Sequence, residues 1–304
     1  MKPARVRAGR RVVEVKRPDK PLFGADGPTK LELAEYYVRV APLMLPLLRD
    51  RPVALERYPD GIDGGGFYVK HPTVPDWVRE VDTSGGRMMV CQDAAALVWC
   101  ADQAAITQHA WLSREPNLGR PDRMVFDFDP PGAGAEAFEQ CRAAAHDTRK
   151  VLDDLGLAAY VMTTGSRGVH IHSPLRPELA DQEVRDLARE IADRVAARRP
   201  DELTTKVRKN TREGRLFVDY LRNGREQLAV APYSVRVRPG APVATPITWA
   251  ELEELETAAD LTVADRRTEC PFAHMAAHAR SPRKALRRLG RVTEVCAAPG
   301  AGST

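Results

Sequence analysis

The sequence predicts a mixed fold of the α/β (α+β) class. Short β-type runs, rich in Val, Ile, Phe and Tyr, alternate with helical runs in which apolar residues recur every three to four positions. No internal repeat occurs at the periods of solenoid proteins. No apolar run approaches the roughly 20 residues of a membrane helix, and residues 1–20 lack the apolar centre of a signal peptide. These observations argue against a membrane-spanning or secreted protein.

The first 120 residues predict two helices and several short strands. Thr29 is a suitable N-cap for a helix from Lys30 to Leu48, in which Pro42 and Pro46 predict a kink or a break. Strands are expected at residues 52–57, 67–70 and 87–92, and an alanine-rich helix at 94–105.

The second half of the chain also predicts alternating strands and helices. A β-type run from Arg123 to Asp129 stops at two prolines, and a helix should follow at 135–155. The other expected elements are strands at 158–163 and 169–173, a helix at 180–198, a hairpin of strands 214–220 and 227–232, a helix at 249–255, and a basic segment at 280–291.

Positive charge is concentrated at the N-terminus. Eight Lys or Arg residues and two acids give residues 1–20 a net charge of +6, whereas the whole chain carries +4. A second basic cluster spans residues 206–215. Nucleic-acid phosphates would explain both clusters, although a solvated terminus could carry the same charges without a partner. Five scattered cysteines form no CxxC pair, which argues against disulfide and zinc frameworks and favours a reducing cytoplasm.

Carboxylates within apolar strands are the clearest chemical signal. Asp127 and Asp129 lie two residues apart and therefore share a face of their strand, while Phe126 and Phe128 face the other way. A third acid, Asp219, lies within another apolar strand. Adjacent carboxylates repel unless a cation lies between them, which favours a divalent metal. The alternative is that each acid caps a strand or pairs with an arginine; the following prolines argue against a haloacid-dehalogenase phosphatase.

A glycine turn lies between these acids in the sequence, at residues 163–172. Gly165 and Gly168 would let backbone N–H groups approach a phosphate, with Ser166 and Arg167 between them. His170 and His172 share one face of the next strand. A turn between two strands needs glycine for conformational reasons too, so the turn gains weight from its position between the acids.

Three motifs together resemble those of the archaeo-eukaryotic primase superfamily, most closely the polymerase domain of bacterial DNA ligase D. They are Val125–Pro130, Thr164–His170 and Phe217–Tyr220, and the similarity extends from about Lys16 to about Leu255. The resemblance implies a catalytic core at 121–235 like an RNA-recognition motif, packed against an α/β portion at 20–120. A basic arm at 1–19, helices at 246–290 and a flexible tail at 291–304 complete the expected organisation.

The resemblance also implies roles for individual residues. Asp127, Asp129 and Asp219 would hold two Mn²⁺ or Mg²⁺ ions. The nucleotide would be bound by His109, Thr164, Ser166, Arg167, Gly168, His170 and Arg236, and DNA by Lys20, Lys30, Arg57, Phe67, Tyr68, Lys70 and Lys209. Lys20 and Lys30 keep the spacing of two lysines that recognise a 5′-phosphate, and Phe67-Tyr68 matches an aromatic pair that stacks on template bases.

Three departures from the family pattern modify these expectations. Thr164 replaces the usual serine, which affects the contact with the sugar 2′-hydroxyl, and Glu56 stands where relatives commonly have a basic residue. The 304 residues contain no ligase motif and no nuclease module. A stand-alone relative is therefore expected, with a separate ligase as partner.

The resemblance implies an enzyme of the bacterial cytoplasm, associated with the nucleoid. It would fill short gaps at DNA breaks in non-homologous end joining, using nucleoside triphosphates and favouring ribonucleotides. Its substrate would be a gapped or broken duplex with a 5′-phosphate, and a Ku-like end-binding protein could recruit it. The alternatives are a primase that starts chains without a primer and a non-catalytic DNA-end-binding module.

Overall fold

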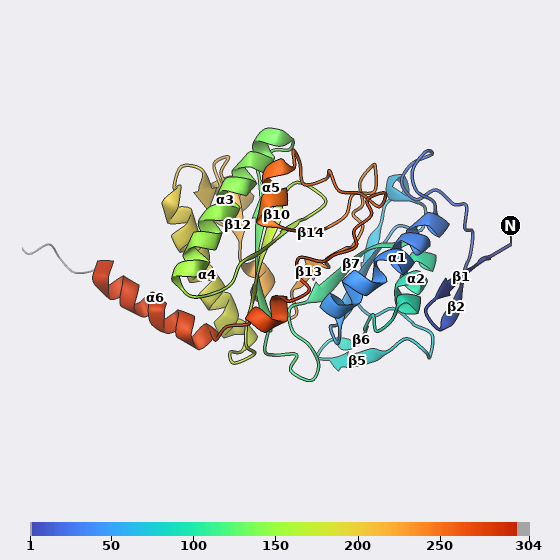
Figure 1. Ribbon diagram of the computed structural model, residues 1–304, viewed down its shortest axis with the longest axis horizontal. Coiled ribbons are helices and arrows are strands. Elements are labelled where there is room, and N and C mark those ends of the chain that lie inside the picture. Colours follow the sequence, from blue (N-terminus) through green and yellow to red (C-terminus); the bar gives the residue numbers. More distant parts are fainter. Residues whose placement is uncertain (1, 297–304) are drawn as a thin grey trace, which may run out of the picture.

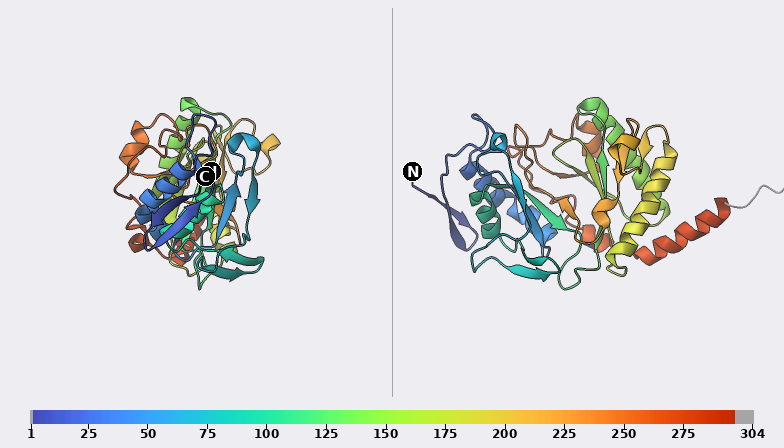
Figure 2. Two further views of the ribbon diagram at one scale, coloured as in Figure 1. Left: turned by 90° about the vertical axis from the view of Figure 1, so that its right-hand side faces the viewer. Right: turned by 180° about the vertical axis from the view of Figure 1, so that it is seen from behind.

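The computed structural model describes residues 2–296, which form two β-sheets that lie side by side, each with its own hydrophobic core (Figure 1). No helix in this part of the chain combines the length and the apolar character needed to cross a membrane. The chain crosses between the sheets more than once, because β13 lies in the first sheet whereas β12 and β14 lie in the second. The rear view in Figure 2 shows the two sheets side by side from the other direction.

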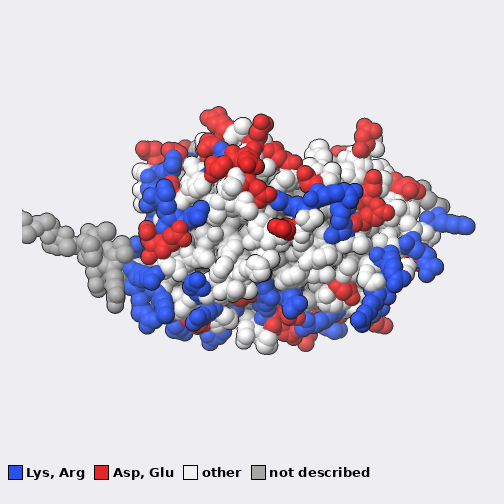
Figure 3. Space-filling model, in the orientation of Figure 1, with Lys and Arg blue, Asp and Glu red and all other residues white. Residues whose placement is uncertain are grey.

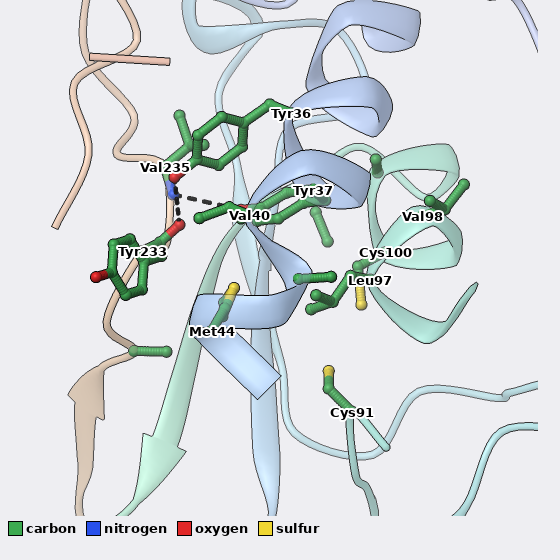
Figure 4. Close-up of a cluster of buried hydrophobic side chains, with 14 of the residues drawn as sticks. Tyr36, Tyr37, Val40, Met44, Cys91, Leu97, Val98, Cys100, Tyr233 and Val235 are labelled. Atoms are coloured by element: carbon green, nitrogen blue, oxygen red, sulfur yellow. Dashed lines mark hydrogen bonds between the residues drawn. The ribbon is translucent and has the colours of Figure 1, made fainter. Parts of the chain in front are cut away.

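The first sheet belongs to the N-terminal portion, with one strand supplied from much later in the chain. Its strand order is β13-β7-β3-β6-β5, and β4 pairs with β3. The bounds are β3 Val53–Arg57, β4 Phe67–Val69, β5 Glu80–Thr83, β6 Gly86–Met89, β7 Ala105–Trp111 and β13 Leu228–Val230. Helices α1 (Lys30–Leu48) and α2 (Ala94–Asp102) pack against each other and form the core with this sheet. Figure 4 shows this core: Tyr36 and Tyr37 of α1 lie toward Tyr233 and Val235, whereas Leu97 and Cys100 of α2 lie on the other side of α1.

Helix α1 begins as predicted but does not break. Thr29 accepts the Glu32 amide, and the Glu32 carboxylate accepts the Thr29 amide in return, which completes a capping box. The expected break at Pro42 and Pro46 is wrong, because both lie inside one continuous helix. The apolar face of α1 is buried along its whole length, and this packing outweighs the roughly 3 kcal/mol that an internal proline costs.

The second sheet carries the motif strands. Its order is β11-β12-β8-β10-β9-β14, and the central unit runs β8-α3-β9-β10-α4-β12 along the chain. The bounds are β8 Arg123–Asp129, α3 Ala135–Asp154, β9 Tyr160–Thr163, β10 Val169–Pro174, α4 Asp181–Arg198, β11 Leu203–Thr204, β12 Leu216–Asp219 and β14 Pro246–Ile247. Helices α3 and α4 pack on each other and cover one face of the sheet (Figure 1).

The predicted hairpin of strands 214–220 and 227–232 is wrong. Strand β12 pairs with β8 in the second sheet, whereas β13 crosses to the first sheet and pairs with β7. Residues 228–230, assigned from the sequence to the catalytic core, therefore belong to the other sheet. The chain then returns to pair β14 with β9.

The two ends of the described chain are more ordered than their composition predicts. Residues 4–15, expected as part of a basic arm, form the hairpin of β1 (Ala4–Ala8) and β2 (Arg11–Val15), and its apolar side chains pack on α1 and α2. At the other end, α5 (Trp249–Glu254) is followed by α6 (Pro282–Cys296), which continues into the expected tail. The tail residues 297–304 lie outside the described residues.

Candidate active site

The floor of the site is formed by β8 and β12. Phe126 and Phe128 are buried in the core, so Asp127 and Asp129 emerge on the opposite face of β8, as the alternation predicts. Asp219 lies directly across from Asp127 in the antiparallel pairing of β12 with β8. Directly paired residues share a face of a sheet, so the three carboxylates lie on one surface.

The two paired carboxylates have different electrostatic surroundings. Burial and the charge of Asp127 raise the pKa of Asp219 above its ordinary value. Burial acts on Asp127 in the same sense, but His170, Arg222 and Arg236 outweigh it and hold the pKa of Asp127 below its ordinary value. His170 Nε2 lies 3.3 Å from one Asp127 oxygen. The result is a pair of acids under mutual repulsion, which a bound cation would relieve.

Arginines already occupy part of this acidic surface. Arg222 Nε lies 3.4 Å from Asp219 and 3.8 Å from Asp127. Asp129 is turned toward Arg167, whose Nη2 is 2.8 Å away, and toward Arg212, at 3.3 Å. Within residues 2–296, no three His, Cys, Asp or Glu side chains are gathered as a ready metal site. The carboxylate oxygens are the donors that Mg²⁺ and Mn²⁺ prefer, so the donor set fits such ions once these arginines exchange partners.

The turn from Thr164 to Gly168 forms a second side of the site. The Thr164 hydroxyl donates to the Gly168 carbonyl at 3.0 Å and accepts from the Ser166 and Gly168 amides at 3.3 and 3.2 Å. Those two amides, expected to approach a phosphate, are therefore directed at Thr164 in this structure. A Cβ at Gly168 would lie 1.9 Å from the Phe128 carbonyl oxygen, so only glycine lets the turn approach β8 this closely.

The third side comes from the first sheet. His109 of β7 lies with its Nε2 3.3 Å from the Tyr68 hydroxyl of β4 and 3.4 Å from a Glu56 carboxylate oxygen of β3. Burial lowers the pKa of His109, and the hydrogen bond to Glu56 opposes this shift. The Glu56 carboxylate itself, although burial works against it, has a lowered pKa because it bonds His109 and Tyr58. Glu56 thus contacts a predicted nucleotide-binding residue.

These sides enclose a cavity of about 380 Å³ between the two sheets. Of the predicted site residues, it is lined by Tyr68, Lys70, His109, Asp127, Asp129, Thr164, Ser166, Arg167, Gly168, His170 and Arg236. Asp219 is buried directly behind this lining. Five cations and three acids line the cavity, so its charge favours an anionic ligand of the size of a nucleotide.

Sequence reasoning missed three charged residues of this lining: Arg222, Glu226 and Arg238. Arg238 donates from Nε to the Ser166 hydroxyl at 2.8 Å, and Arg236 donates to the Thr164 carbonyl at 2.9 Å. The spacing Asp219-x-x-Arg222 was a usable signal for Arg222, because three residues make one turn of the short helix at Leu221–Asn223.

The predicted DNA-binding residues are not all gathered at the cavity. Phe67 and Tyr68 are 49% and 59% exposed beside it, with the Arg57 guanidinium 5.6 Å from the Phe67 ring centre. Lys209 is exposed at the end of a separate loop. Lys20 and Lys30 are each bonded within the domain: Lys20 bonds Asp60 and the Pro59 carbonyl, and Lys30 bonds Asp102 and the Lys16 carbonyl.

Lys30 is the least accessible of these residues. Its side chain is 5% exposed, and burial lowers its pKa despite the neighbouring Asp102. A 5′-phosphate could reach the Lys30 ammonium only if Asp102 or the Lys16 carbonyl gave way. The phosphate-binding role of Lys20 and Lys30 stays a prediction.

The comparison with protein families decides what this site belongs to. A family model described as the primase-polymerase domain of LigD matches residues 29–290. The chain belongs to this family. The match includes all three motif strands and both sheets of the LigD-type domain, apart from the N-terminal hairpin.

Known relatives agree with this assignment. The domain is 37% identical over 258 residues to the multifunctional non-homologous end joining protein LigD of Pseudomonas aeruginosa, covering 83% of this chain and 30% of the relative. It is 30% identical over 262 residues to the bifunctional non-homologous end joining protein LigD of Bacillus subtilis, covering 84% and 42%. The chain therefore spans less than half the length of these relatives.

A solved structure matches almost the whole fold. The polymerase domain of Mycobacterium tuberculosis ligase D, in complex with DNA, matches with a TM-score of 0.79 and 32% sequence identity. The match covers 88% of this chain and 99% of that domain. The mixed α/β class predicted from the sequence is confirmed, and so is the family.

Proposed function

We propose that this chain is a template-dependent nucleotidyltransferase that fills short gaps at DNA breaks in non-homologous end joining. It adds nucleotides, ribonucleotides in preference to deoxyribonucleotides, to a primer 3′-hydroxyl. One observation carries the proposal: in a chain of the LigD primase-polymerase family, Asp127, Asp129 and Asp219 share one surface beside a cationic cavity. The central β-α-β-β-α-β unit also supports a core like an RNA-recognition motif.

The three carboxylates would hold two Mg²⁺ or Mn²⁺ ions. When bound, such ions lower the pKa of the attacking hydroxyl and neutralise the triphosphate and its pyrophosphate leaving group. The mutual repulsion of Asp127 and Asp219 supports this role, because among the described residues the one arginine within 4 Å of both carboxylates is the partly exposed Arg222. His170 would keep Asp127 oriented through its 3.3 Å contact.

The remaining residues of the cavity would bind and orient the substrates. Arg236 and Arg238 border the glycine turn and would hold the triphosphate through charge-assisted hydrogen bonds. Phe67 is an exposed platform beside the cavity and would stack on a template base. His109 would contact the nucleotide from the first sheet. A Ku-like end-binding protein and a DNA ligase are the proposed partners.

A variant of the acidic surface tests the proposal. Asp127→Ala combined with Asp129→Ala should abolish incorporation of labelled nucleotide into a short gapped duplex with Mn²⁺, while fluorescence anisotropy finds DNA affinity within about threefold of wild type. Asp82→Ala, at a side chain that is 94% exposed, is the matched control and should retain activity. Normal incorporation by the double variant would refute the assignment.

The choice of substrate separates gap filling from priming. Incorporation on a gapped duplex should exceed incorporation on an unprimed single strand, and ribonucleotides should compete successfully with deoxyribonucleotides on the same gap. Equal incorporation on the gapped duplex and on the unprimed single strand would favour a primase. DNA binding by the wild type with no incorporation under any condition would favour an end-binding module.

A further inference from the structure

The outer face of the β1–β2 hairpin is strongly basic. Its inner side chains Val6, Ala8, Val13 and Val15 are buried, so the strand alternation turns Arg5 and Arg7 outward. Arg10 and Arg11 at the tip are exposed, and Lys16 and Arg17 follow directly. Figure 3 shows Lys and Arg gathered at this end of the molecule, where Figure 1 places β1 and β2.

These cations lack the compensation that other arginines of the domain have. Arg142, Arg149, Arg189 and Arg198 on α3 and α4 each lie within 4 Å of a carboxylate. Among the described residues, none of the six hairpin cations has such an ion pair. Glu14 and Asp19 are the only acids in the same 20 residues. An uncompensated row of cations is the electrostatic signature of a surface that binds a polyanion.

A groove of about 530 Å³ runs between the hairpin and α2. Three cations line it, Arg10, Arg11 and Lys16, together with Trp77, Trp99 and Gln103. Two acids line it as well: Glu14, and Asp102, whose carboxylate is paired with Lys30. The Arg11 guanidinium lies 5.1 Å from the Trp77 ring centre, and Trp99 is 8% exposed. Arg11 covers one face of Trp77, which also packs against the core, and Trp99 is buried, so this groove suits phosphates rather than unstacked bases.

The groove is connected to the candidate active site through bonded residues. The Gln103 carbonyl accepts from Arg57 Nε at 2.9 Å, and Arg57 lies over Phe67. Phe67 is next to Tyr68, which lines the cavity of the three carboxylates. A strand held at that cavity could therefore continue over Arg57 toward the hairpin.

Lys30, one of the two residues predicted to bind the 5′-phosphate, bonds the Lys16 carbonyl and Asp102 at the edge of this groove. We propose that the hairpin face and its groove bind the sugar-phosphate backbone of the duplex on the downstream side of the gap. The proposal deepens the proposed function, since it takes DNA as the substrate. The hairpin adds affinity that depends on the length of the downstream arm and contributes nothing to base recognition.

The test compares two variants with the same change of charge. Arg5, Arg7 and Arg10 are replaced by Gln in the first; the control replaces Lys150 of α3, Arg189 of α4 and Arg287 of α6, all exposed, by Gln. Affinity is measured by anisotropy for 5′-phosphorylated gapped duplexes with downstream arms of about 6 or about 20 base pairs, over a salt series. Circular dichroism confirms that both variants are folded.

The hairpin variant should bind the long-arm duplex about tenfold more weakly at low salt, and its salt slope should fall by roughly two to three, about 0.9 for each lost phosphate contact. Its affinity for the short-arm duplex should match the wild type, as should the control on both. Wild-type affinity and slope of the hairpin variant on the long arm would overturn the proposal. An equal loss on a single strand of 20 nucleotides would overturn the assignment to duplex.

The outcomes also separate this proposal from the proposed function. If DNA affinity depends on the length of the downstream arm but no nucleotide is incorporated, the hairpin is still a DNA-binding surface and the proposed polymerase activity is refuted. If the wild type incorporates nucleotides but binds duplexes with short and long downstream arms equally well, the polymerase activity is supported and the role of the hairpin is refuted. Unchanged DNA binding together with lost binding of an acidic protein would assign the hairpin to a protein partner instead.

Discussion

A buried ion-pair cluster connects the two halves of the domain, and Asp122→Asn tests how much this cluster contributes to the stability of the fold. Asp122 precedes β8 and accepts two hydrogen bonds from Arg51 Nη2, at 2.6 and 2.7 Å, and one from Arg114. Arg51, at the end of α1, is 1% exposed, and Arg123 is 4% exposed. Asparagine keeps the shape of Asp122 but leaves these buried guanidinium groups without an anion.

The magnitude follows from the pKa of Asp122. Burial opposes ionisation, but Arg51, Arg123 and Arg114 lower the pKa to about 2 from an ordinary 3.8. A shift of this size corresponds to about 2 kcal/mol of stabilisation of the folded state. Removal of one partner from a buried pair costs up to about 5 kcal/mol, because the other charge stays buried. Asp122→Asn should therefore lower the free energy of unfolding at pH 7 by roughly 2–4 kcal/mol.

Urea denaturation followed by circular dichroism measures this loss. Because the folded-state pKa is depressed, the stabilisation is present above about pH 4 and is lost as the pH falls toward 2. The difference in the free energy of unfolding between wild type and Asp122→Asn should therefore become smaller as the pH falls from 4 toward 2. The exposed control Asp82→Asn should change the free energy by less than about 0.5 kcal/mol. The reasoning would be refuted if Asp122→Asn changed the free energy of unfolding at pH 7 by as little as the control, or if the loss were the same at every pH.

Two further predictions concern the site. Gly168→Ala places a methyl group 1.9 Å from the Phe128 carbonyl oxygen, so it should reduce nucleotide incorporation at least tenfold and lower the melting temperature by several degrees. The control Gly119→Ala, which has open space around it, should change neither quantity. Unchanged incorporation by Gly168→Ala would contradict the close approach of the turn to β8. Glu56→Gln removes the hydrogen-bonded anion that raises the pKa of His109, so an NMR titration of the His109 ring should shift to lower pH. An unchanged titration would show that Glu56 does not act on His109.

The faces of the motif strands follow from the sequence by local rules. Successive side chains of a strand alternate between faces, so the run Val125–Asp129 fixes which residues enter the core and which form the site. The Thr29 capping box and the amphipathic runs of α3 and α4 were predictable for the same reason. Each depends on neighbours within a few residues.

The partners of those elements depended on segments far apart in the chain. Only the tertiary fold pairs β12 with β8, sends β13 to the other sheet, buries Lys30 beside Asp102 and brings Glu56 to His109. Strand pairing and burial balance chain entropy against contacts across many residues, and no local periodicity records that balance. The sequence by itself thus determined the faces of the motif strands and the family, whereas the tertiary structure decided which charges surround the three acids.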